Sequence, residues 1–188
     1  MRSRRQGFTF IELLIVCLII GIVAAFAAPK IDVTKYKIES GMQGIGITLL
    51  GVERQAITQQ HDIIVLFDVA NQALRIHEDN NNNGQVDPGE RVRSVPLGDQ
   101  VVFGRGAATA MSMGSGPVTF TKVVRGYPAL VFHRDGSASE AGGFYLTSKR
   151  ALNYSGGYKQ DSRAILVDRA TGRASWYRYG TSTWVKAF

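Results

Sequence analysis

The stretch that decides the fold is Phe8 to Ala28, FTFIELLIVCLIIGIVAAFAA, an almost unbroken apolar run near the start of the chain. At about 1.5 Å per residue, a helix of this length covers roughly the 30 Å hydrocarbon core of a bilayer. The residues before it, MRSRRQG, include Arg2, Arg4 and Arg5 and no acid. Because basic flanks stay on the cytoplasmic side, everything after Pro29 is predicted to lie on the other side of the membrane.

Glu12 interrupts this apolar run within its first helical turns. A carboxylate inside a bilayer costs about 2.5–3.5 kcal/mol on insertion scales, so an intramembrane acid is a functional hypothesis by default. A free α-amine, created by cutting the chain just before Phe8, is the nearest group that could neutralise it. The alternative is that Glu12 lies near enough to the membrane edge for water to solvate it.

Residues Gly7 to Glu12, GFTFIE, resemble the class III signal peptide of type IV prepilins. In that family a short basic leader ends in Gly, and the mature chain begins with Phe. The resemblance implies that a prepilin peptidase cuts between Gly7 and Phe8 and methylates the new amine of Phe8. It also implies that Glu12 pairs with the N-terminal amine of a neighbouring subunit during assembly.

An ordinary secretory signal is the competing interpretation, with cleavage after Ala25-Phe26-Ala27. That reading would release a soluble secreted protein, and an enzyme would then be one class to consider. The apolar run is longer than the roughly 7–15 residues of a normal signal core, and it contains an acid. Both features favour the prepilin-type leader.

A second helix is predicted from residue 30 to residue 60. Its apolar residues recur at alternating spacings of four and three, which marks one face of a helix. They are Ile38, Met42, Ile45, Leu49, Val52 and Ala56. The segment is predicted to continue the apolar helix as one spine, with a kink at Pro29, because proline removes a backbone hydrogen bond. The glycines at 41, 44, 46 and 51 weaken this helix or allow close packing.

Residues 61–188 are predicted to form a β-rich head, because β-branched and aromatic segments alternate with Gly- and Asn-rich turns. The candidate strands are 63–69, 73–78, 91–95, 100–104, 117–121, 129–133, 143–148, 163–168, 173–180 and 182–188. The predicted class is α+β: a long N-terminal helix, half membrane-embedded and half amphipathic, packed on an antiparallel head. The predicted divisions are a leader (1–7), a transmembrane helix (8–29), an amphipathic helix (30–60) and the head (61–188).

Three stretches of the tail resemble the GspH/FimT family of minor pilins and minor pseudopilins. They are Phe132 to Gly136 (FHRDG), Gly143 to Leu146 (GFYL), and Arg163 to Val167 followed by Thr171-Gly172-Arg173. The resemblance implies a pilin-like fold and a non-enzymatic, structural and assembly role in a type IV pilus or a type II secretion pseudopilus. The implied partners are other pilins or pseudopilins, the prepilin peptidase and the inner membrane. The leader would then lie in the cytoplasm and the head in the periplasm, until the subunit enters the filament.

One segment has the spacing of a calcium loop. Asp79 to Glu90, DNNNNGQVDPGE, fits the twelve-residue pattern whose oxygen ligands recur at fixed positions. Here the ligands would be Asp79, Asn81, Asn83, the carbonyl of Gln85, Asp87 and Glu90. The flanks look like strands, and a metal-free polar hairpin loop explains the same residues. No other cofactor is predicted, because Cys17 is the single cysteine and the three histidines are far apart.

The formal net charge is +7, and the basic residues gather late in the chain, interleaved with Trp176, Tyr177, Tyr179 and Trp184. Such a surface suits DNA, which binds cations through phosphate and aromatic rings through its bases. The resemblance to FimT-type minor pilins implies a DNA contact through a G-R-x-R segment, with Arg169, Arg173 and Arg178 as candidates. Gly172-Arg173-Ala174-Ser175 lacks the second arginine. A filament-tip module that contacts DNA or a surface is the second functional hypothesis, and a merely solvated strand face is the structural alternative.

Overall fold

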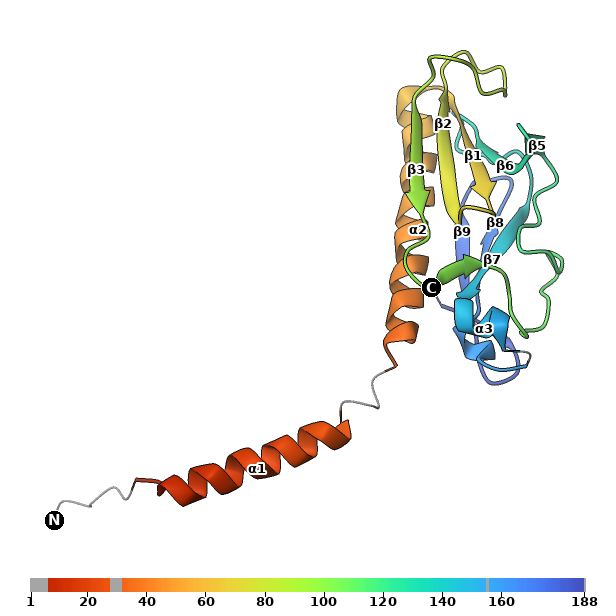
Figure 1. The fold of residues 1–188 in the computed structure, drawn as a ribbon. Helices are drawn as coiled ribbons and strands as arrows, with labels where there is room; N and C mark the ends of the chain where they lie inside the picture. Colours follow the sequence, from red (N-terminus) through yellow and green to blue (C-terminus); the bar gives the residue numbers. More distant parts are fainter. Residues whose placement is uncertain (1–6, 28–31, 155, 188) are drawn as a thin grey trace. The chain divides into compact units, whose positions relative to one another are not determined.

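A computed structural model describes residues 7–27, 32–154 and 156–187 (Figure 1). The chain divides into two compact units, Met1–Val33 and Thr34–Phe188. The first unit holds helix α1, Phe10–Ala27. Within the described ranges, none of the helices combines the length and apolar character that a membrane crossing needs. The predicted leader residues 1–6, the kink at Pro29 and the junction at 28–31 lie outside the described residues.

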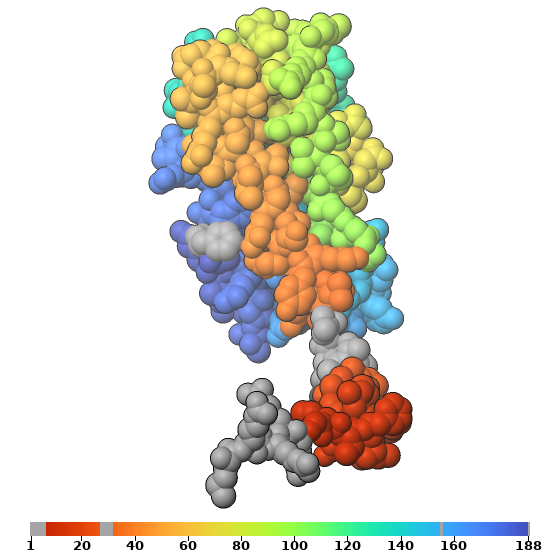
Figure 2. Space-filling view, turned by 90° about the vertical axis from the view of Figure 1, so that its left-hand side faces the viewer, coloured from red at the N-terminus to blue at the C-terminus, as the bar shows by residue number. Residues whose placement is uncertain are grey.

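Helix α2, Val33–Gln59, matches the predicted amphipathic helix to within a few residues. Every residue of the predicted stripe is buried, from Ile38 through Ala56. The helix therefore belongs to the same compact unit as the strands, since its apolar face forms one wall of their core. Figure 2 shows α2 running along the surface between the segment that holds β3 and the C-terminal strands, with its polar face open to solvent.

The strands among the described residues form two antiparallel sheets, ordered β3-β2-β1-β6-β5 and β10-β9-β8-β7-β4. The first contains β1 (Asp62–Asp68), β2 (Ala73–Asp79), β3 (Val92–Pro96), β5 (Val123–Val124) and β6 (Tyr127–Phe132). The second contains β4 (Val101–Phe103), β7 (Gly142–Ser148), β8 (Arg163–Val167), β9 (Ala174–Tyr179) and β10 (Trp184–Lys186). The α+β prediction, with a helix packed on an antiparallel head, is confirmed.

The main core lies between α2 and the inner faces of both sheets. Successive side chains of a strand point to opposite faces, and β1 follows this rule. Val65 and Phe67 enter the main core, whereas Ile64 and Leu66 form a smaller cluster on the outer face with Val86. Phe67 sits at the centre of an aromatic group, with ring centroids 5.0 Å from Phe144. All of these core residues lie after Thr34, so the second unit contains its own complete core.

The candidate strand at 117–121 was wrong. Val118 forms only an isolated bridge with Phe144, and the amides of Thr121 and Lys122 donate to the carboxylate of Glu140 at 2.9 Å. The Thr119 amide still donates to the Gly143 carbonyl of β7, but the Glu140 side chain takes the donors that would continue this pairing. Helix α3, Lys149–Asn153, was not predicted; it begins where the Ser148 hydroxyl accepts a hydrogen bond from the amide of Ala151 at 3.1 Å.

At Gly172 the β8–β9 turn comes very close to the backbone of the β6–β7 turn. Both turns pack on the C-terminal half of α2. The φ of Gly172 is +63°, and an added Cβ would stand 2.4 Å from the carbonyl oxygen of Gly136 and 3.5 Å from Glu53. Gly136 in turn lies against Ile57 of α2. Only glycine therefore allows the β8–β9 turn, the β6–β7 turn and the helix to meet.

We expect Gly172→Ala to lower the free energy of unfolding by about 2–5 kcal/mol, from left-handed backbone strain plus an unavoidable contact with backbone. Gly126→Ala is the matched control, because Gly126 has a φ of +82° but nothing within 4 Å of an added Cβ. The control should lose only the strain, about 1–2 kcal/mol. Urea unfolding of residues 34–188 measures both, and equal losses would contradict the close approach.

Candidate functional site

The residues around the predicted cleavage point form a helix start. Gly7, Phe8 and Thr9 precede α1 in non-helical backbone, and the Phe8 side chain is 90% exposed. The Thr9 hydroxyl accepts a hydrogen bond from the amide of Glu12 at 3.3 Å. One Glu12 carboxylate oxygen accepts from the Thr9 amide at 2.7 Å and from its hydroxyl at 2.8 Å. The bond between Gly7 and Phe8 is thus exposed and adjacent to a capped helix.

This reciprocal arrangement is a capping box, in which an N-cap threonine and a glutamate three residues later satisfy each other's backbone amides. Sequence reasoning missed it, although Thr9-Phe10-Ile11-Glu12 has the required T-x-x-E spacing. The capping box gives Glu12 a local role in starting α1, beside the assembly role that the sequence predicts. The carboxylate is held at the very start of the helix, close in sequence to the amine that cleavage would create.

The Asp79–Glu90 loop uses its own carboxylates as hydrogen-bond acceptors. Asp79 ends β2 and accepts from the amides of Asn83 (3.1 Å) and Gly84 (2.7 Å). Asp87 accepts from the side-chain amides of Asn81 (2.9 Å) and Asn83 (2.7 Å), and these bonds hold the pKa of Asp87 below its usual value. The loop joins strands β2 and β3, as the hairpin interpretation expects.

The loop is also anchored to the sheet beneath it. Val86 is buried on the outer face of the first sheet, and its carbonyl accepts from Arg125 at 2.5 Å. No group of three or more Asp, Glu, His or Cys side chains able to hold a metal ion occurs in the described parts of the chain. Calcium binding by Asp79, Asn81, Asn83, Gln85, Asp87 and Glu90 stays a prediction of the spacing alone.

The structure separates the three arginines that were considered for DNA. Arg169 and Arg173 lie in or beside the β8–β9 turn, whereas Arg178 is five residues further along β9, about 17 Å at the usual strand rise. Arg178 lies opposite Arg163, whose guanidinium pairs with Glu39 of α2 at 3.1 Å. The three side chains therefore do not form one compact cluster.

Three of the four aromatic residues of the basic tail are engaged within the head. The Trp176 ring lies against α2, so close that a Cβ on Gly46 would stand 1.6 Å from it. Trp184 donates its indole N–H to the carbonyl of Thr109 at 2.8 Å and packs against Tyr179, which is buried. These rings pack against other parts of the head. Such packing is what the structural alternative to DNA binding expects, in which one face of the strand is buried and its charged face is solvated.

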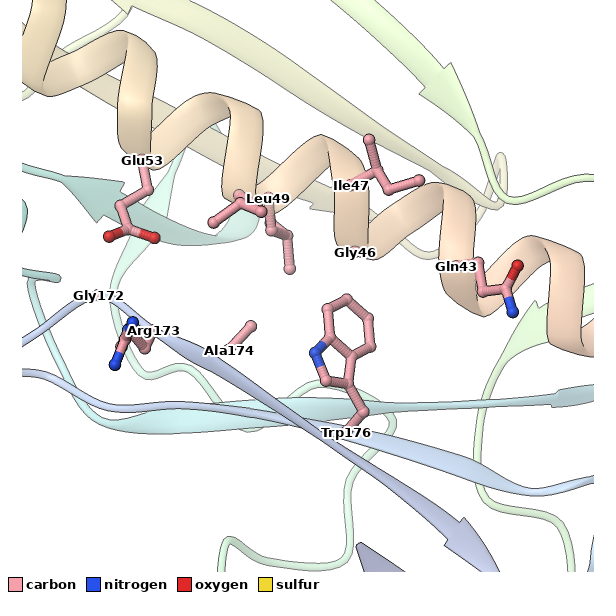
Figure 3. Close-up of a pocket in the computed structure, with 10 residues that line it drawn as sticks. Gln43, Gly46, Ile47, Leu49, Glu53, Gly172, Arg173, Ala174 and Trp176 are labelled. Atoms are coloured by element: carbon pink, nitrogen blue, oxygen red, sulfur yellow. The ribbon is translucent and has the colours of Figure 1, made fainter. Parts of the chain in front are cut away.

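An apolar groove of about 350 Å³ lies between α2 and β9 (Figure 3). Figure 3 shows Leu49 and Ala174 along its length, with Glu53 and Arg173 toward one end and Trp176 toward the other. Ile47, also lining it, is 72% exposed. The alternation of β9 places Ala174 and Trp176 on the face toward α2, a pattern readable in sequence, but the missing side chain at Gly46 is what leaves room for the indole.

The histidines lie apart. His133 follows β6, and its Nδ1 is 2.7 Å from a carboxylate oxygen of Asp62. His77 is in the middle of β2 and is 6% exposed, and neither of its ring nitrogens has a hydrogen-bond partner among the described residues. Burial lowers the pKa of His77, the positive charge of Arg125 lowers it further, and the carboxylate of Glu90 partly opposes them. His77 is thus held neutral against the outer face of the sheet.

Comparison with known proteins identifies the N-terminus. Residues 2–28 match the family model described as "Prokaryotic N-terminal methylation motif". The chain therefore carries the N-terminal motif of proteins that are methylated at this end, and the match includes Gly7, Phe8 and Glu12. No curated protein sequence matches the chain.

Two solved structures are similar to the chain, both of the minor pseudopilin EpsH from the type II secretion system of Vibrio cholerae. The first is 18% identical over 79% of this chain and 99% of that chain, with a TM-score of 0.47. The second is 16% identical over 78% of this chain and 99% of that chain, with a TM-score of 0.46.

We expect acid to destabilise the head partly through His77. Its folded-state pKa is lowered, so its contribution is fully present above the unfolded value of about 6.5 and is lost as pH falls below it, because the unfolded chain then binds the proton first. His77→Leu should reduce the loss of unfolding free energy between about pH 7 and pH 5, measured by urea unfolding of residues 34–188. An unchanged pH profile in that variant would contradict a neutral buried histidine.

Proposed function

We propose that this chain is a minor pilin or minor pseudopilin of the GspH/FimT type. It would serve as a structural and assembly subunit of a type II secretion pseudopilus or a type IV pilus. The observation that carries the proposal is the methylation motif across residues 2–28. Within that range the Gly7–Phe8 bond is exposed and lies just before a capped apolar helix, which supports cleavage there. A prepilin peptidase would cut that bond and methylate Phe8.

The head supports the same assignment through the residues on which the family resemblance rests. Phe132 and Gly136 from one stretch, and Gly172 from another, converge on the C-terminal half of α2. Gly143, from the third stretch, has no room for a side chain, since an added Cβ would stand 2.2 Å from the carbonyl oxygen of Ile165. The resemblance thus falls on glycines that the close packing of the head requires, two of them beside α2.

The proposed location is the inner membrane, with the basic leader in the cytoplasm and the head in the periplasm, followed by entry into a filament of other pilins or pseudopilins. The proposed mechanism is physical and asks no catalysis of the head. Glu12 first completes the capping box with Thr9. As the apolar helix enters the filament, the carboxylate exchanges these neutral donors for the charged amine of a neighbour. Such a charge-assisted bond is about twice as strong as a neutral one, and low dielectric strengthens it further.

N-terminal processing tests the class directly. Co-expression of the full chain with a prepilin peptidase should give a mature protein that begins at N-methylated Phe8, because the peptidase reads the basic leader and the exposed Gly7–Phe8 bond. Mass spectrometry of the N-terminal peptide measures both cleavage and methylation. A mature start at Ala28, or an uncut chain in the presence of active peptidase, would reject the proposal.

Glu12→Ala and Glu12→Val should leave the precursor in the membrane but lower its incorporation into filaments at least about tenfold, the equivalent of roughly 1.4 kcal/mol. The ratio of filament-bound to membrane-bound subunit, measured on sheared filaments, is the readout. Thr9→Val is the matched control, because it removes the capping hydroxyl but keeps the carboxylate. Wild-type incorporation of either Glu12 variant, or an equal defect in Thr9→Val, would contradict the charge-pairing role.

A further inference from the structure

One end of the head, beside the first turns of α2, gathers two exposed lysines, the half-exposed Lys37, two exposed tyrosines and an exposed leucine. Figure 1 places α3 at this end, and Figure 2 shows the adjoining light-blue segment next to the start of α2. We call the group the basal surface. It consists of Lys37, Lys149, Leu152, Tyr154, Tyr158 and Lys159.

Direct contacts connect most of this surface. The Lys37 ammonium is 2.5 Å from the carboxylate of Asp99. The backbone carbonyl of the next residue, Gln100, accepts a hydrogen bond from the amide of Lys149 at 3.0 Å. From α3, the Arg150 guanidinium lies over the Tyr158 ring at 4.3 Å from its centroid. The Tyr154 and Tyr158 rings are 6.0 Å apart and meet edge to face.

The support beneath this surface is rigid. Asp161 is 1% exposed and accepts from the Arg150 guanidinium at 2.7 Å and from the Ser148 hydroxyl at 2.6 Å. Ser148 also caps α3 through the amide of Ala151. The ion pair and the cap fix α3 and the 3₁₀ turn at Lys159–Asp161 relative to the second sheet, so the side chains above them stay in place.

Much apolar area on this end stays exposed although the side chains contact their neighbours. Leu152 is 50% exposed, Tyr154 64% and Tyr158 48%. Lys149 and Lys159 are exposed beside them. Three acids near this end already have cationic partners, since Asp99 pairs with Lys37, Glu39 with Arg163, and Asp161 is buried against Arg150. The surface therefore presents positive charge around a tyrosine–leucine centre.

This chemistry fits the headgroup layer of an anionic bilayer. Tyrosine is enriched at membrane–water interfaces, where its ring is apolar and its hydroxyl is hydrated. Lysines near an anionic surface each contribute roughly 1 kcal/mol, which is about fivefold in affinity. Nucleic acid fits less well, because Leu152 cannot stack on bases and two of the rings already meet each other and Arg150.

The length of the chain between α1 and α2 indicates which partner could cover the basal surface. Only residues 28–32 separate α1 from α2, and five residues span at most about 18 Å. A bilayer that held α1 would therefore be within reach of the basal surface, at the end where α2 starts. Resting on the proposed function, we propose that the basal surface docks the head onto anionic lipid headgroups of that membrane before the subunit enters a filament.

Vesicle binding by residues 34–188, which hold their own complete core, tests this docking without the apolar helix. The unit should sediment with vesicles that contain phosphatidylglycerol and not with pure phosphatidylcholine vesicles. Lys149→Gln/Lys159→Gln should weaken the binding about 25-fold, and Leu152→Ser/Tyr154→Ser should weaken it without changing the net charge. Thermal melting confirms that each variant is folded.

Arg134→Gln/Arg169→Gln is the matched control. It removes the same charge beside the C-terminal end of α2, where Gly136 meets Ile57 and the Arg169 carbonyl accepts from Ala138. Its lipid affinity should stay within about twofold, because charges beyond a Debye length are screened.

Three results would overturn the proposal: equal binding to neutral vesicles, no loss in the Lys149/Lys159 variant, or an equal loss in the control. Binding of single-stranded or duplex DNA, without vesicle binding, would overturn it as well and would assign the surface to nucleic acid. Processing and filament incorporation of the full chain are measured independently. A failure of docking is therefore distinguishable from a failure of the proposed function.

Discussion

The apolar face of α2 packs against the inner faces of two antiparallel sheets, and the remaining structure of the head follows from that contact. Ile45 and Leu49 face a core that neither sheet could close alone, because each sheet has one apolar face to bury. The glycines of the helix divide accordingly: Gly46 admits the Trp176 ring, whereas Gly44 meets open space. The same contact makes the helix part of the head, and it leaves the opposite helix face exposed to solvent.

The start of α1 depends on a second local contact, the capping box between Thr9 and Glu12. An apolar helix must satisfy its first amides, and Thr9 and Glu12 do so reciprocally. Under the proposed function, the same carboxylate would later enter an apolar filament and would need a charged partner, which an amine released at Phe8 would supply. The capping box is made of neutral donors and lies at a helix end, so it can be exchanged for a stronger ionic contact without disturbing the rest of α1.

Much of the architecture could be predicted because it follows from local periodicity. The stripe from Ile38 to Ala56 predicted both the helix and its buried face, and most strands lie where β-branched and aromatic residues alternate. The segment at 117–121 has the same composition but is not a strand. Its pairing with β7 stops at Thr119, and the next amides on that side, from Thr121 and Lys122, donate to the Glu140 carboxylate. Helix α3 was missed because five residues are too few for a periodic signal.

The sequence by itself determined the class of the N-terminus, because leader charge, Gly7, Phe8, Glu12 and an apolar run of membrane length are consecutive and need no fold to be read. It also determined an α+β chain with an amphipathic helix, since amphipathicity is local. Only the tertiary structure decided which scattered residues act together. It split Arg169 and Arg173 from Arg178, committed Trp176 and Trp184 to packing, and assembled the basal surface from α2, α3 and the following turn. Those groupings depend on contacts between residues far apart in the chain, and no local pattern encodes such distances.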